Sequence, residues 1–79
     1  MIKIGGIMKK IGDYYFAKID VKQCGSFMVK SVIDMDDDDI LGGCLDNGLL
    51  DADDVPFADI DTFIDEYDLS ALKSCTFEI

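Results

Sequence analysis

The feature that most constrains how this chain can fold is a long stretch of one-sided charge. Residues 31 to 72 hold thirteen Asp, one Glu and no basic residue, which gives that stretch a net charge of −14. Residues 1 to 30 hold six Lys and two Asp, so the opening of the chain is positive. Self-repulsion among like charges destabilises a compact state, so the acidic stretch needs either a function or a fold that tolerates it.

The apolar content predicts that the chain nevertheless folds around a core. Hydrophobic residues make up 49% of the 79 residues, with five Phe and three Tyr, which is too apolar for a disordered acidic tail. We expect one domain over residues 1–79, of modest stability because so short a chain buries only about 60–65% of its unfolded surface. No apolar run approaches the ~20 residues of a membrane span, and no secretory leader is evident, so we expect a cytoplasmic protein.

Apolar residues alternate with polar ones in three segments. Residues 14–21, 27–35 and 75–79 each show this period of two, which is typical of half-buried strands. A short apolar segment over residues 2–11 precedes them, and turn signals stand at 12–13 and 22–26. The alternation also predicts that Tyr14, Phe16 and Met28 point away from the core, where they are candidates for an apolar contact patch.

The period changes after residue 35, where "DDDDILGG" predicts a helix. Asp36 is placed to cap this helix, and the three acids that follow favour the positive end of its dipole. Gly42 and Gly43 weaken the helix by roughly 1 kcal/mol each.

A second helix is predicted over residues 59–68, where Ile60, Phe63, Ile64 and Tyr67 recur at helical spacing. We expect this apolar stripe to pack on the sheet while the acids face water. The predicted order is β-β-β-α-α-β. It corresponds to an α+β domain in which an antiparallel sheet of three to four strands carries two helices on one face.

No pattern of residues predicts catalysis, a cofactor or a metal centre. The aspartate runs fail the register of a calcium loop, which needs Gly at its sixth position and Glu at its twelfth. The chain has no His to activate a nucleophile or to complete a zinc site with Cys24, Cys44 or Cys75. We expect a protein that is not an enzyme and whose cysteines are buried thiols of a reducing compartment.

The acids themselves are the candidate site. Carboxylates four residues apart on a helix, such as Asp61 and Asp65, lie ~6 Å apart along its axis, a length comparable with the charge spacing of a nucleic-acid backbone. The predicted partner-binding residues are Asp36, Asp37, Asp38, Asp39, Asp51, Asp53, Asp54, Asp59, Asp61, Asp65, Glu66 and Asp68. A solvated face, with several of these acids serving only as helix caps, is the alternative.

In length, charge asymmetry and predicted element order, the chain resembles the small acidic inhibitors encoded by bacteriophages, namely DNA-mimic and anti-CRISPR proteins. The resemblance implies binding without catalysis to a basic nucleic-acid-handling protein, such as a bacterial defence nuclease or its effector complex, and no direct contact with nucleic acid. Two alternatives stay open: an antitoxin or immunity protein that neutralises a cognate toxin, and a divalent-cation-binding protein.

Overall fold

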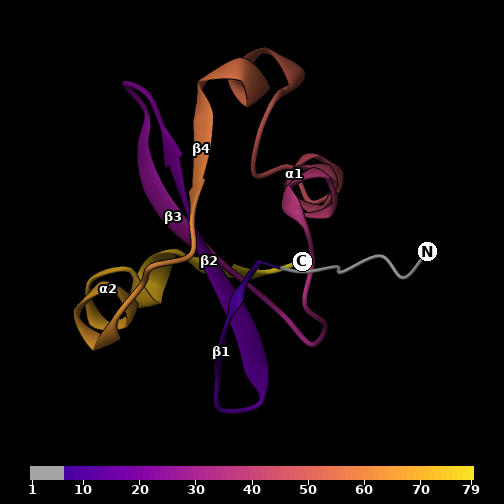
Figure 1. Ribbon diagram of the computed structural model, residues 1–79. Coiled ribbons are helices and arrows are strands. Elements are labelled where there is room, and N and C mark those ends of the chain that lie inside the picture. The colour runs from indigo at the N-terminus through magenta and orange to yellow at the C-terminus, as the bar shows by residue number, and fades with distance from the viewer. Residues whose placement is uncertain (1–6) are drawn as a thin grey trace.

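The computed structural model describes residues 7–79, and it confirms the α+β class (Figure 1). The predicted apolar segment over residues 2–11 therefore lies partly outside the described residues. The strands are β1 (Lys9–Ile11), β2 (Tyr14–Val21), β3 (Gly25–Ser31), β4 (Ala58–Asp61) and β5 (Thr76–Glu78). The helices are α1 (Asp37–Asp46) and α2 (Glu66–Ala71), with 3₁₀ turns η1 (Ala52–Phe57) and η2 (Lys73–Cys75).

Strand β2 is the centre of a mixed, five-stranded sheet. It pairs antiparallel with β3 along one edge, while β1 and β4 share its other edge, β1 opposite residues 14–16 and β4 opposite residues 18–21. Strand β5 extends the sheet by pairing parallel to β3. The prediction of an antiparallel sheet of three to four strands is therefore wrong in two details. The β3–β5 pairing is parallel, and β4 adds a fifth strand because it fills the part of the β2 edge that β1 leaves open and satisfies backbone groups there.

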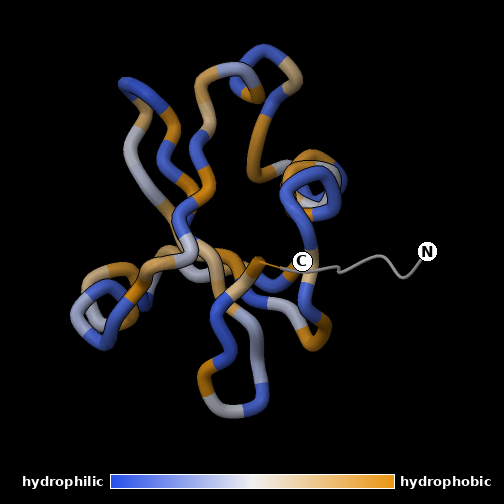
Figure 2. The backbone as a smooth tube through the Cα atoms, in the orientation of Figure 1, coloured by the Kyte–Doolittle hydropathy of each residue, from blue (hydrophilic) through white to orange (hydrophobic). Residues whose placement is uncertain are grey.

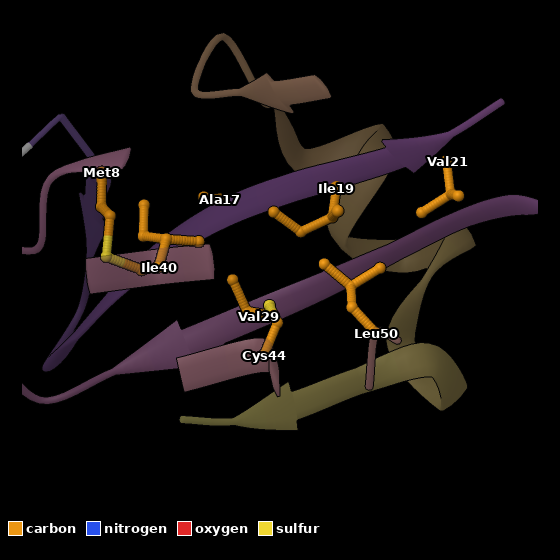
Figure 3. Packing of buried hydrophobic residues seen from close by; sticks show 8 residues of the cluster. All are labelled: Met8, Ala17, Ile19, Val21, Val29, Ile40, Cys44 and Leu50. Carbon is orange, nitrogen blue, oxygen red and sulfur yellow. The ribbon is translucent and has the colours of Figure 1, made fainter. Parts of the chain in front are cut away.

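The β2–β3 hairpin and helix α1 build the main core. Ala17, Ile19 and Val21 of β2 and Val29 of β3 point to one face and are buried, as the alternation predicts. Figure 3 shows Ile40 and Cys44 of α1 packed over these strands, with Met8 and Leu50 closing the two ends of the cluster.

The N-terminus of α1 lies where the sequence predicts it. The Asp36 side chain caps the helix by accepting a hydrogen bond from the Asp39 backbone N–H at 2.9 Å. Strand β3, however, ends at Ser31 and not at Met35. The Ser31 hydroxyl accepts a hydrogen bond from the Ile33 backbone N–H at 3.1 Å, a local turn that competes with strand pairing.

Helix α2 covers the opposite face of the sheet, so the prediction of two helices on one face is wrong. Met28 alternates away from Val29 in β3, and it is fully buried on the α2 side together with Ile64. Lys18, the β2 partner of Met28, reaches Asp68 of α2 at 3.7 Å. Figure 1 accordingly shows α1 and α2 on either side of the sheet. Both faces of the hairpin carry apolar side chains, and each of them needs a cover.

The predicted helix over residues 59–68 is replaced by strand β4, a short connection and α2. The Asp61 carboxylate accepts a hydrogen bond from the Phe63 backbone N–H at 2.9 Å, which turns the chain away from a helix. Asp65 and Asp68 then form a reciprocal capping box, which starts α2 at Glu66. Only Ile64 of the predicted apolar stripe is fully buried.

Candidate interaction surface

Several of the predicted binding acids are used to hold local structure. Their carboxylates accept backbone N–H groups at helix starts and turns, which is the role that short acidic side chains fill at such positions. This set comprises Asp36, Asp54, Asp61, Asp65 and Asp68. Asp51 is exposed at the start of η1, and its backbone N–H donates to the Asp54 carboxylate at 3.3 Å.

Hydrogen bonds from backbone N–H groups also keep the Asp65 carboxyl group ionised. The backbone N–H of Asp68 holds the pKa of the Asp65 carboxyl below its usual range, and the Tyr67 N–H and the Asp68 side chain act in the same direction. The positive charge of Lys9 contributes too. Asp65 therefore keeps its negative charge while it caps α2.

The remaining predicted acids are exposed, and their carboxylates have no side-chain or backbone partner among residues 7–79. They stand in the first turn of α1, in η1, on β4 and in the first turn of α2. This set comprises Asp37, Asp38, Asp39, Asp53, Asp59 and Glu66. These carboxylates are available for contacts with another molecule.

The fold divides the acids between two faces, and it does not place Asp61 and Asp65 on one helix as we expected. Asp61 lies on β4 and Asp65 lies in the connection before α2, so the two are not neighbours on one helix. The acids of α1 and those of α2 lie on opposite sides of the sheet (Figure 1). In Figure 2 the hydrophilic segments are likewise spread over the periphery of the chain.

Three lysines have contacts at the sheet, and only one of these contacts is an ion pair with a predicted binding acid. Lys9 donates to the Ile64 carbonyl at 2.6 Å, and Lys18 pairs with Asp68. Lys30 lies 4.7 Å from the centre of the Tyr14 ring, an attractive cation–π distance.

The first candidate contact region is the α2 surface, defined as Phe63, Asp65, Glu66 and Tyr67. Phe63 is 92% exposed and Tyr67 is 79% exposed, although both belong to the stripe that the sequence assigns to the core. Two acids lie between them in the chain, one of them without any partner among the described residues. The spacing of Asp65 and Asp68 is that of a capping box, and this feature of the sequence could have indicated that the helix begins after Phe63.

The second region is the α1 groove, a shallow depression of about 540 Å³ beside α1. Ile33, Met35 and Ile79 contribute apolar surface, Asp38, Asp39 and Asp46 contribute carboxylates, and Gly42, Gly43 and Asn47 complete the lining. The sequence prediction missed this groove because it placed residues 33–35 in a strand and left Asp46 out of the site.

Tyr14, Phe16 and Met28, the candidates for an apolar contact patch, are not exposed together. Met28 is fully buried. Tyr14 and Phe16 are half-buried and pack edge to face, with their ring centres 6.5 Å apart.

The cysteines lie in three different environments. Burial raises the pKa of the Cys44 thiol to about 11, so this core thiol stays protonated at neutral pH. Cys24 is exposed in the β2–β3 turn, and Cys75 is half-buried in η2, so the prediction that the thiols are buried holds fully only for Cys44. Between residues 7 and 79, no three acidic or cysteine side chains lie together in a way that could hold a metal ion.

Comparison with known protein families, with characterised proteins and with solved structures finds no match to this chain. Across residues 7–79, no helix is long and apolar enough to cross a membrane.

Proposed function

We propose that this protein is a non-catalytic acidic inhibitor that binds a basic nucleic-acid-handling protein and occupies the surface on which that protein holds nucleic acid. The observation that carries the proposal is the α2 surface, where two strongly exposed aromatic residues flank two acidic residues in the chain. Buried aromatic side chains supply much of the binding energy of protein interfaces, while charge selects the partner and speeds association.

The exposure of the rings supports a contact role for this surface. Burying a Phe side chain is worth about 1.5–3 kcal/mol, and Phe63 gives up nearly all of this gain in the free protein. A partner that covered Phe63 and Tyr67 would recover it. The neighbouring carboxylates of Asp65 and Glu66 favour a partner that presents Lys or Arg around an apolar depression.

The charge distribution supports a nucleic-acid-handling partner in particular. Proteins that bind DNA gain affinity by placing Lys and Arg against its closely spaced phosphates. This chain has a net charge of −10, so it can compete for the same basic surface. The partner class that we propose is a bacterial defence nuclease or its effector complex, which a phage-encoded protein would meet in the host cytoplasm.

The test is affinity capture from bacterial lysate with three immobilised proteins. They are the wild-type protein, the Phe63→Ala/Tyr67→Ala variant and a Val32→Ala/Phe57→Ala control, which truncates two exposed apolar side chains elsewhere. Capture is compared at ~50 mM and ~500 mM salt, where the screening lengths differ about threefold. Retained proteins are then eluted with duplex DNA or with RNA.

We expect the wild-type and control proteins to retain a basic nucleic-acid-binding protein at low salt. The Phe63→Ala/Tyr67→Ala variant should not retain it, and nucleic acid should displace it. A partner that DNA and RNA both fail to displace would contradict mimicry. If that partner were a dedicated toxin, the immunity-protein alternative would replace our proposal.

A further inference from the structure

Nothing in the described structure requires residue 42 to be glycine. It lies inside α1, where glycine is the least favourable residue apart from proline. A side chain built at Gly42 would meet nothing within 4 Å. The neighbouring Gly43 is different, because a Cβ there would lie 3.2 Å from the Ile79 Cβ, so Gly43 allows α1 to pack closely against the end of the sheet.

The surface that Gly42 leaves open is the α1 groove. Ile33 of this groove is 58% exposed, although a large aliphatic side chain gains free energy when it is covered. Asp38, Asp39 and Asp46 stand around it, and their carboxylates have no partner within residues 7–79. The groove therefore combines exposed apolar surface, negative charge and a helix whose backbone another molecule can approach closely.

Charge decides which occupant fits. A second copy of this chain would bring another −10 of net charge to the acidic rim, and a nucleic acid would bring its phosphates. Both are repelled. A polypeptide segment with Lys or Arg on either side of an apolar residue complements the groove in charge and in polarity.

We propose that the α1 groove docks a basic, amphipathic segment of the partner protein. An apolar side chain of that segment covers Ile33 and approaches α1 at Gly42, while its cationic side chains face Asp38, Asp39 and Asp46. The class of partner rests on the proposed function. The groove adds a second contact on the face of the sheet opposite the α2 surface, so the partner holds the protein from two sides.

The probe is a synthetic helical peptide with Leu on one face and Lys on the other, titrated into the protein and followed by heteronuclear NMR. The control peptide carries Ser in place of Leu at the same charge. We expect the Leu/Lys peptide to shift the backbone amide signals of Ile33, Met35, Gly42 and Gly43, and the Ser/Lys peptide to bind more weakly.

Two matched sets of charge variants separate the groove from general acidity. Asp38→Asn/Asp39→Asn/Asp46→Asn neutralises the rim, and Asp13→Asn/Asp20→Asn/Glu78→Gln removes the same charge at acids that belong neither to the groove nor to the predicted partner-binding set. We expect the rim variant to weaken peptide binding about tenfold and the control variant to weaken it only slightly. Equal losses in the two variants would overturn the proposal.

Gly42→Gln gives a test in which stability and binding change in opposite directions. Replacing the helical glycine by a better helix former should raise the melting temperature by about 4–8 °C, while the new side chain fills the groove. We expect peptide affinity to fall about tenfold, as for the rim variant. Unchanged affinity in this folded variant would overturn the proposal.

The same titration distinguishes this inference from the proposed function. Peptide-induced shifts confined to Phe63 and Tyr67 would overturn the groove and leave the α2 surface in place. No peptide-induced shift at either surface would count against both. Groove signals that move with protein concentration before any peptide is added would identify a second copy as the occupant and overturn our assignment.

Discussion

Eight buried side chains join α1 and its flanking segments to the sheet, whereas Met28 and Ile64 are the buried apolar residues of the opposite face within the described chain. On the α2 side, polar contacts also attach the covering segment to the sheet. Lys9 donates to the Ile64 carbonyl, and Lys18 pairs with Asp68. The helix there has six residues, against ten in α1. The two faces thus differ in how they are stabilised and in how much apolar surface they leave exposed.

This difference shows how a small acidic domain can fold and still present apolar contacts. Stability is concentrated where buried apolar area is large, and segments with few buried contacts open locally at lower free energy. The α2 side can leave Phe63 and Tyr67 in water because the α1 side supplies most of the core. The predictions that follow test this division of roles.

The largest effect is expected from truncation of the α1 core. Ile40 is fully buried between α1 and the sheet, so Ile40→Ala should lower the free energy of unfolding by about 2–5 kcal/mol. Phe63→Ala removes a larger side chain, yet it should change that free energy by no more than about 0.5 kcal/mol because the ring is exposed. Urea denaturation of both variants measures the contrast. Similar losses of unfolding free energy in the two variants would show that both faces of the sheet contribute comparably to stability.

The two helix caps should have unequal effects. Asp36→Ala removes the cap of a helix that is packed on the core, and it should lower the global free energy of unfolding by about 1 kcal/mol. Asp65→Ala removes the equivalent bond from α2. Its effect should appear mainly as faster hydrogen exchange within α2, with little change in the urea midpoint. A large global loss for Asp65→Ala would show that α2 unfolds together with the core.

The parts of the fold that could be predicted from the sequence depend on local signals. The alternation in residues 14–21 needs only its own side chains to indicate a strand, and Asp36 caps α1 through an N–H three residues along. Strand β4 was not predictable in this way. Its Ile60 lies at helical spacing relative to Phe63 and Ile64, and only pairing with the distant β2 edge makes residues 58–61 a strand.

The candidate site shows the same limit. The abundance of acids and the absence of basic residues between 31 and 72 are visible in the sequence. The sequence does not show which carboxylates accept backbone hydrogen bonds. Asp61 and Asp65 differ from Asp59 only through the turns that bring N–H groups to them. Phe63 and Tyr67 were assigned to the core, since periodicity cannot show that a capping box interrupts a helix.

A smaller effect is expected from the ion pair that links α2 to the sheet. The Lys18 and Asp68 side chains are each 23% exposed and stand 3.7 Å apart, so solvent screens much of their attraction. A double-mutant cycle with Lys18→Met and Asp68→Asn should give a coupling of about 0.5 kcal/mol. A coupling several times larger would mean that charge, and not Met28 and Ile64, holds α2 on the sheet.

The smallest and most local effect is the response of α2 to acid. The pKa of Asp65 is lowered in the folded state, so its charged form stabilises α2 above the unfolded-state pKa of ~3.9, and this contribution is lost as pH falls through the folded-state pKa. The Asp68 amide resonance should therefore titrate with a midpoint below ~3.9, because its N–H donates to Asp65.

Asp65→Asn is the matched control, since it keeps an oxygen acceptor and removes the titrating group. Near neutral pH the wild-type α2 amides should exchange more slowly than those of the variant. The two proteins should converge once the pH falls below the folded-state pKa of Asp65, while the amides of α1 show no difference between them. A difference that persisted in acid would show that the Asp65 cap acts through geometry and not through charge. The α2 surface would then keep its shape, and its two aromatic rings, independently of pH.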